Sequence, residues 1–319
     1  MAIETPWGQL TVSDAHVHFF SHRFFDTLIA QKNALQKNAA QNELSFETLA
    51  PLLEWQLPPE TPALLADIWV RELDRYGVQS AVLIASVPGD AASVIAAVRK
   101  YPQRFFGYMM VNPLLPDSIS SVQFALQGGH MHGLCLFPAM HCYSLHDERV
   151  AALIDAAASS RAVVFVHCGV LSVGVRQKLG LPSQFDMRFS NPIDLHSIAL
   201  RYPQLRFVVP HFGAGYFREA LMLCDLCPNV YLDTSSSNGW MKFEGGECDL
   251  AAVFRRALAV AGARRLLFGT DSSFFPRGWN AEVFQAQVKA LGAIGATEET
   301  ARLIFNDNLQ QLLARQASV

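Results

Sequence analysis

The chain has 319 residues, of which 51% are hydrophobic and 17% are charged, so it can bury a large core. A formal net charge of −3 without a basic run argues against a nucleic-acid-binding surface. The N-terminal residues lack the pattern of a signal peptide, and no apolar run approaches the ~20 residues that cross a bilayer. We therefore expect a cytoplasmic protein with no membrane partner and no nucleic-acid partner, whose six cysteines are packing residues in a reducing interior.

Short β-rich runs alternate with longer amphipathic stretches along the whole chain. The runs typical of buried strands are residues 10–14, 80–86, 105–111, 133–137, 163–167, 206–210, 230–233 and 265–269. The stretches with helical periodicity are residues 61–76, 90–101, 117–127, 147–159, 191–202, 215–226, 249–260 and 280–314. The runs are continuously apolar, as expected of parallel strands covered on both faces. Eight such strand–helix units predict one α/β domain over residues 1–319, a (β/α)8 TIM barrel.

Two connections are longer than a barrel loop requires. Residues 19–60, roughly, follow the first strand-like run and contain a helical pattern over residues 24–38. Residues 171–188 follow the fifth run. Long connections after the strands of such a barrel lie on its C-terminal face, so we expect a helical insertion there that builds a lid and a substrate pocket.

Five side chains with metal-ligand chemistry follow the strand-like runs. His16 and His18 come after the first run, and alternate residues of an extended chain share one face, so both rings point the same way. His167, His211 and Asp271 come after the fifth, sixth and eighth runs. Catalytic residues of these barrels lie at the carboxyl ends of the strands, so the sequence predicts that all five meet on one rim. Neutral imidazoles and a carboxylate can together hold a divalent transition metal.

Four motifs carry these residues. They are Asp14-Ala15-His16-Val17-His18, Val164-Phe165-Val166-His167-Cys168-Gly169, Val209-Pro210-His211-Phe212-Gly213-Ala214-Gly215 and Phe268-Gly269-Thr270-Asp271-Ser272. In order and spacing they resemble the amidohydrolase superfamily, specifically the amidohydrolase-related group that includes aminocarboxymuconate-semialdehyde decarboxylase. The similarity runs from about Val12 to Leu313.

The resemblance implies one divalent metal held by His16, His18, His167 and Asp271, with zinc expected and Mn²⁺ as the alternative. It implies that His211 is a general acid or base beside the metal, or a further ligand. Dinuclear members of the superfamily use a carboxylated lysine on strand four, whereas Cys135 occupies the corresponding position here. A mononuclear site is therefore expected. The resemblance also implies a homodimer.

The expected activity is that of a metal-dependent hydrolase. On this hypothesis the metal lowers the pKa of water towards ~7, Asp271 orients the water and accepts its proton, and His211 assists the substrate oxygen or the leaving group. The substrate would be an amide, ester or lactone of a small organic acid. The alternative is a metal-dependent non-oxidative decarboxylase that uses the same residues, and the ligand motifs do not separate the two reactions. A barrel that only binds a ligand or serves as an assembly subunit is the non-enzymatic alternative.

Several residues near these motifs are candidates for contact with the substrate. They are Phe19, His141, Arg176, Arg188, Arg277 and Trp279. The arginines suit an anionic substrate, and the aromatic side chains suit an apolar pocket wall. Each candidate has a plainer interpretation: loop arginines and histidines are commonly solvated, and some of the aromatic side chains must belong to the core.

Overall fold

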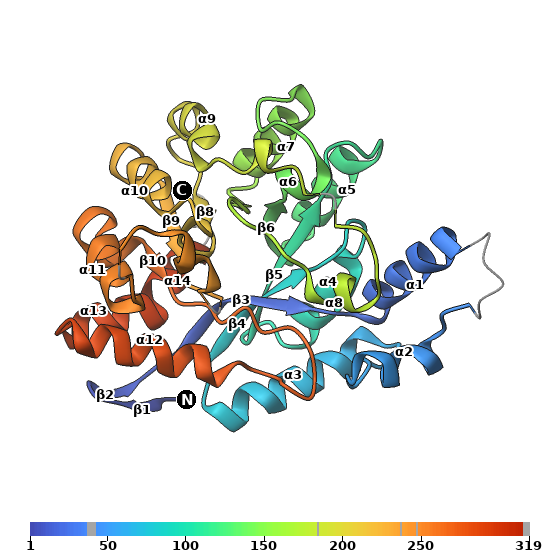
Figure 1. Cartoon of the computed structure of the whole chain (residues 1–319), viewed down its shortest axis with the longest axis horizontal. Helices are drawn as coiled ribbons and strands as arrows, with labels where there is room; N and C mark the ends of the chain where they lie inside the picture. Colours follow the sequence, from blue (N-terminus) through green and yellow to red (C-terminus); the bar gives the residue numbers. More distant parts are fainter. Residues whose placement is uncertain (37–42, 184, 237, 247, 315–319) are drawn as a thin grey trace.

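A computed structural model of the chain describes residues 1–36, 43–183, 185–236, 238–246 and 248–314. Eight parallel strands form one sheet in the order in which they occur in the chain, and this sheet curls into a barrel inside a layer of helices (Figure 1). The strands are β3 (Ser13–Phe19), β4 (Ser80–Ala85), β5 (Phe105–Val111), β6 (Met131–Leu136), β7 (Val163–Val166), β8 (Phe207–Val209), β9 (Val230–Asp233) and β10 (Leu266–Leu267). The predicted TIM barrel is confirmed.

Helices connect and cover these strands. The α-helices are α1 (His22–Gln36), α2 (Phe46–Leu53), α3 (Pro62–Tyr76), α4 (Ala91–Lys100), α5 (Ser118–Gln127), α6 (Pro138–His141), α7 (Glu148–Ser159), α8 (Gly174–Lys178), α9 (His196–Arg201), α10 (Phe217–Leu226), α11 (Leu250–Ala261), α12 (Ala281–Ala293), α13 (Glu298–Arg302) and α14 (Asn308–Leu313). Shorter turns of other helical types are η1 (Met187–Phe189), η2 (Pro192–Leu195), η3 (His211–Gly213), η4 (Gly239–Phe243), η5 (Ala263–Arg265) and the π-helical η6 (Leu303–Asp307).

Helix α3 shows why these segments fold as they do. Pro62 stands at its first turn, where a missing N–H costs nothing, and Gly77 ends it in the left-handed region with φ 72°. Its buried residues recur every three or four positions and form one apolar stripe: Leu65, Ala66, Trp69, Val70 and Leu73. The closing region predicted over residues 280–314 is interrupted for the same kind of reason, since Gly295 follows α12 with φ 69°.

The first barrel strand lies later in the chain than the sequence predicts. Residues 8–10 form β2 (Gly8–Leu10), which pairs with β1 (Ile3–Thr5) in a separate antiparallel hairpin, and β3 continues to Phe19. His16 and His18 therefore project from the strand itself. Val17 and Phe19, on the opposite face, are fully buried in the main core. The polar residues Asp14, His16 and His18 interrupt the apolar run, so the predicted strand ended before the second half of β3.

The barrel closes between β3 and the segment that follows β10. The N–H of Asp271 donates to the carbonyl of His16 at 3.0 Å, and the N–H of His18 donates to the carbonyl of Ser272 at 2.7 Å. Val17 and Ser272 form a parallel bridge between these hydrogen bonds. Backbone pairing therefore fixes Asp271 beside both histidines of β3.

A helical insertion separates β3 from α3, as expected. It contains α1 and α2, and α1 begins at His22 and is described to Gln36, so the last two residues of the helix predicted over 24–38 lie outside the described residues. A satellite hydrophobic cluster joins this insertion to the α8 region through Phe24, Leu28, Leu53 and Leu179. These elements lie together at one side of the barrel in Figure 1.

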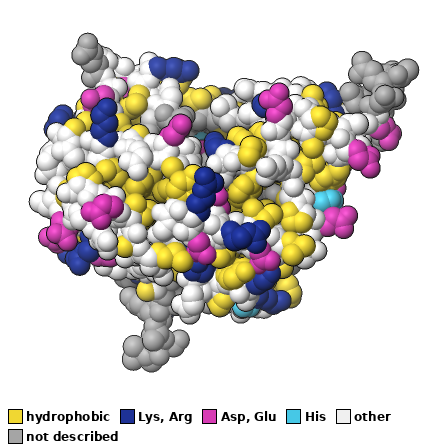
Figure 2. All heavy atoms as spheres, turned by 90° about the horizontal axis from the view of Figure 1, so that it is seen from below, with side chains coloured by type: hydrophobic (Ala, Val, Ile, Leu, Met, Phe, Trp, Pro, Cys, Tyr) yellow, Lys and Arg dark blue, Asp and Glu magenta, His cyan; other side chains and the backbone are white. Residues whose placement is uncertain are grey.

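The distribution of charged side chains on the surface agrees with the small net charge of the chain. Lys and Arg side chains are interspersed with Asp and Glu side chains on the face that Figure 2 shows, in keeping with the net charge of −3. Within the described residues, no helix has the length and apolar character needed to pass through a membrane.

Candidate metal centre

Three side chains bring metal-ligand atoms together at the mouth of the barrel. Asp271 Oδ1 lies 3.2 Å from His18 Nε2 and 3.6 Å from His16 Nε2, and the two Nε2 atoms are 3.3 Å apart. The ligand atoms of the three residues all lie within 4.8 Å of one another. Two imidazole nitrogens and one carboxylate oxygen at this spacing form a donor set that suits zinc or manganese.

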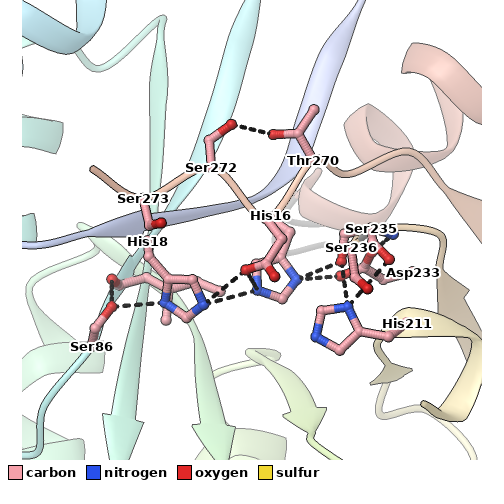
Figure 3. A network of polar contacts seen from close by, with 12 residues as sticks. His16, His18, Ser86, His211, Asp233, Ser235, Ser236, Thr270, Ser272 and Ser273 are labelled. Carbon is pink, nitrogen blue, oxygen red and sulfur yellow. Dashed lines mark hydrogen bonds and ion pairs between the residues drawn. The ribbon is translucent and has the colours of Figure 1, made fainter. Parts of the chain in front are cut away.

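Asp233 orients the His16 ring. His16 Nδ1 donates to Asp233 Oδ2 at 2.6 Å, and Ser235 Oγ lies 3.0 Å from the same nitrogen (Figure 3). Burial acts to lower the pKa of His16, but the charge and hydrogen bond of Asp233, together with the charges of Asp271 and Asp14, raise it. Because Nδ1 carries the proton, the lone pair of Nε2 is directed to Asp271 and His18, which is the orientation that metal-binding histidines require.

Ser86 has the equivalent role for His18. Its hydroxyl donates to the carbonyl of Ile84 at 3.0 Å, so it accepts from His18 Nδ1 at 2.8 Å. Burial lowers the pKa of His18, which keeps the ring neutral. Both rings of the pair are thus held in the same tautomer with Nε2 directed into the site, and the donor set fits a bound cation.

Asp271 completes the triad from an unusual backbone conformation. Its φ is 58°, in the left-handed region that residues other than glycine rarely adopt. Burial acts to raise the pKa of its carboxyl group, but the adjacent rings of His18 and His16 lower it below its usual range. The side chain remains 37% exposed. The structure therefore holds a carboxylate anion against two imidazoles with one side open to the cavity.

His167 and His211 face the triad. The ring of His211 stacks on His16 with centroids 5.0 Å apart, and His167 lies 5.2 Å from His211. His211 also has a positive φ of 56°, and its Nδ1 donates to Ser235, with the serine Oγ at 2.9 Å and its carbonyl oxygen at 3.3 Å. Burial lowers the pKa of both rings. All five side chains predicted to share a rim line one cavity of about 300 Å³.

Aromatic side chains form much of the remaining wall of this cavity. Phe20 stacks on Phe24 and Trp55 stacks on Phe274, each pair with centroids 4.0 Å apart. The guanidinium of Arg277 lies 4.5 Å above the Phe274 ring and donates to the carbonyl of Asp271 at 3.1 Å. Arg277 thus places a cation at the edge of an aromatic pocket, next to the triad.

Two of the residues predicted to contact the substrate belong to the core instead. Phe19 is fully buried, and its neighbour Phe20 lines the cavity in its place. Trp279 is 2% exposed, and its Nε1 donates to Asp14 Oδ2 at 2.8 Å. The expectation for Phe19 was wrong because successive residues of a strand point to opposite faces, and the expectation for Trp279 was wrong because its side chain turns inward from the loop after β10.

The other four candidates lie on the surface, in a neighbouring cavity or in the cavity beside the triad. Arg188 is 83% exposed, pairs with Asp186 at 2.6 Å on the surface and is not among the described residues that line the cavity. Arg176 and His141 line a neighbouring cavity of about 560 Å³. Arg277 alone among the six candidates lines the metal cavity itself.

Some residues of the site were missed at the sequence level. Asp233 and Ser235 hold His16 and His211, and Asp14 accepts from the backbone of His16 and from Thr270. Asp233 is the last residue of a predicted strand, so the rule that identified His167 and His211 could have found it. Ser86, at the end of the second predicted strand, carried the same signal.

A family model and a curated protein match this chain in sequence. A family model described as Amidohydrolase matches residues 13–314. Among curated proteins, Protein fluG of Emericella nidulans is 37% identical over 87 residues, which are 27% of this chain and 10% of that protein. The match thus spans a small part of that much longer relative.

Solved structures share the fold at low sequence identity. A variant of the 5-carboxyvanillate decarboxylase of Novosphingobium aromaticivorans, with bound manganese and 3-methoxy-4-hydroxy-5-nitrobenzoic acid, has a TM-score of 0.63 and 17% identity, covering 98% of this chain and 99% of that one. A probable 2-pyrone-4,6-dicarboxylic acid hydrolase of Acinetobacter baumannii, with citric acid bound, has a TM-score of 0.59 and 14% identity, covering 95% and 99%. Decarboxylases and hydrolases are therefore both among the structural relatives.

Proposed function

The chain belongs to the amidohydrolase family, and on that premise we propose that it is a metal-dependent hydrolase of an amide, ester or lactone. The substrate would be a small molecule that carries a carboxylate. The observation that supports this proposal most directly is the convergence of His16 Nε2, His18 Nε2 and Asp271 Oδ1 beneath a cavity whose wall includes His211.

We propose that His16, His18 and Asp271 would hold one divalent metal, zinc or manganese, with His167 as a further ligand from the wall. When bound, such an ion supplies Lewis acidity that polarises a carbonyl oxygen and acidifies water. Cys135 in β6 is fully buried in a hydrophobic cluster with Tyr108 and Phe165 and is not among the described residues that line the cavity. This supports a mononuclear site.

The protein's own groups would manage the protons. Asp271 is an anion with an exposed edge, so it can orient a water molecule in the cavity and accept its proton. His211 uses Nδ1 to bind Ser235, which leaves Nε2 as the ring nitrogen available to the substrate. From there Nε2, which carries the lone pair, can accept a proton from water in the cavity and then pass that proton to a leaving group.

Arg277 is the proposed anchor for the substrate carboxylate. It lines the cavity beside Asp271, and a guanidinium binds a carboxylate through two parallel hydrogen bonds. The stacked pairs Phe20–Phe24 and Trp55–Phe274 offer flat apolar surfaces to a ring. A cyclic or aromatic acid therefore fits this site best.

The aromatic wall also favours a second candidate, a non-oxidative decarboxylase. A carboxylate placed among Phe20, Phe137 and Phe274 would lose hydration, which favours release of CO₂. His211 or Asp271 would take up a proton from solvent and deliver it to the carbon that loses the carboxylate. The similarity to both kinds of solved structure supports either reaction.

The test is to supply the metal-loaded protein with lactones, aryl esters, amides and hydroxylated aromatic acids. Acid release and CO₂ release are measured side by side. Hydrolysis without CO₂ would support the leading proposal, and CO₂ without hydrolysis would establish the second candidate. Neither activity, together with no stoichiometric divalent metal, would favour the non-enzymatic alternative. His18→Ala is expected to lose the metal. His130→Ala is expected to retain it, because His130 directly precedes β6, at the end of the barrel opposite the triad.

The homodimer and the cytoplasmic location expected from the sequence remain predictions. Sedimentation velocity of the purified protein tests the first, and fractionation of the source cells tests the second.

A further inference from the structure

A second cavity of about 560 Å³ lies beside the metal cavity, and we propose that it is a subsite for an extended hydrocarbon arm of the substrate. This inference rests on the proposed function, because it makes the substrate a carboxylate-bearing molecule with a long apolar substituent. The cavity lies between α1, the loop after β4 and the segment after α8.

The two cavities are adjacent and share lining residues. Phe24, Ser86, Met110, Met140 and Val173 line both of them. Ser86 is the residue that accepts the hydrogen bond from His18 Nδ1, so the second cavity comes directly next to the triad at this residue. A ligand whose reacting group lies at the triad can therefore extend into the second cavity.

The wall of the second cavity is chemically suited to hydrocarbon. Most of its apolar side chains come from three segments: Phe24, Leu28 and Leu35 of α1, Val87 and Pro88 after β4, and Leu181, Pro182 and Phe185 after α8. Among its described lining residues, Arg176 is the single Lys, Arg, Asp or Glu. The guanidinium of Arg176 already donates to the carbonyl of Pro182 and to Gln31 Oε1, each at 2.7 Å. Little in this wall would compensate a charged or strongly hydrated arm.

The volumes of the two cavities also support a substrate that occupies both. A cavity of about 300 Å³ is at the lower limit for small-molecule sites, which typically run from about 300 to 1,000 Å³. Addition of the second cavity brings the total towards the upper part of that range. Each methylene group buried there should strengthen binding about fourfold.

The experiment measures binding of butanoate, hexanoate, octanoate and decanoate to the metal-loaded full-length protein by calorimetry. Leu35→Asp places a charge in the second cavity at a side chain that is 61% exposed, so folding should not suffer. Leu52→Asp on α2 is the matched control, since Leu52 is 52% exposed and lies away from both cavities. Thr27→Trp fills the second cavity without adding a charge.

The expected result is an affinity that rises about fourfold per methylene in the unaltered protein. Leu35→Asp and Thr27→Trp should weaken decanoate binding tenfold or more and butanoate binding less than twofold, and Leu52→Asp should change neither. Affinities independent of chain length, or equal losses in Leu35→Asp and Leu52→Asp, would overturn the subsite. Binding needs no chemistry, so a protein without hydrolytic activity would contradict the proposed function while leaving this chain-length dependence measurable.

Discussion

His16 and Asp233 form a fully buried hydrogen-bonded pair, with 2.6 Å between Nδ1 and Oδ2 and side chains that are 1% and 0% exposed. They are 217 positions apart in the chain, on the first and seventh strands of the barrel. Because the pair fixes the proton on Nδ1, it determines which ring nitrogen His16 offers to the metal.

Asp233→Asn is expected to weaken metal binding 10- to 100-fold, because an amide orients the imidazole without supplying its negative charge. Competition with a chromogenic chelator measures the change. Asp186→Asn is the matched control, since Asp186 pairs with Arg188 at the surface. Equal metal affinity in Asp233→Asn and the unaltered protein would contradict the assigned role.

His211→Gln is expected to lower kcat by a factor of about 10² to 10⁴ while the metal content stays the same, since we assign it proton transfer and not metal binding. Steady-state kinetics and elemental analysis of the same preparation provide the two measurements. His196→Gln, on α9, is the control and should change neither. Loss of the metal from His211→Gln would make His211 a ligand instead.

Arg277→Gln is expected to raise KM for a carboxylate substrate about 10- to 100-fold, with a smaller effect on the corresponding neutral amide. Arg277→Lys should recover part of the loss, because it restores the charge without the planar fork. Arg188→Gln serves as the control, because Arg188 pairs with Asp186 on the surface and is not among the described residues that line the cavity. An equal effect of Arg277→Gln on the charged and neutral substrates would exclude a role in carboxylate binding.

Trp279→Phe is expected to lower the free energy of unfolding by about 1–3 kcal/mol, because Asp14 loses a buried hydrogen-bond donor. The effect on KM should be small, since Trp279 lies in the core. Denaturant unfolding and steady-state kinetics distinguish the two roles. A large change in KM with unchanged stability would restore the sequence-based assignment to the substrate pocket.

His141 is expected to make stability depend on pH. Burial lowers its pKa to about 4, whereas the unfolded chain takes up the proton near 6.5. Its contribution is therefore fully present above pH 6.5 and is lost as the pH falls from 6.5 towards 4, by at most about 3 kcal/mol. In His141→Phe the free energy of unfolding should fall less between pH 7 and pH 4.5. Identical pH profiles would show that the folded protein takes up this proton as readily as the unfolded chain.

The barrel and the gathering of its polar rim could be predicted because both depend on local patterns. Parallel strands covered on both faces are continuously apolar, and His167 and His211 each follow such a run directly. Reliance on continuous apolar runs made the predicted first strand too short, because Asp14, His16 and His18 interrupt the apolar run of β3. In the folded chain their polar atoms are satisfied by Thr270, Ser86 and Asp233, partners that no local pattern shows.

Substrate contacts were predicted far less well. Phe19 and Phe20 are adjacent, yet one packs in the core and the other lines the cavity, and Trp279 turns inward to Asp14. Arg277 and Arg188 are both loop arginines, but only Arg277 approaches the triad. Side-chain direction at the end of a strand or within a loop depends on packing partners that are distant in sequence.

The sequence by itself determined the order of strands and helices, the end of the barrel that carries the histidines, and the kind of chemistry that such residues support. The tertiary structure alone decided that Asp233 and Ser86 set the tautomers of His16 and His18, and that the insertion encloses a second cavity. The reason is that periodicity records which residues are buried, whereas hydrogen-bond partners and cavity walls are chosen by segments that meet only after the barrel has closed.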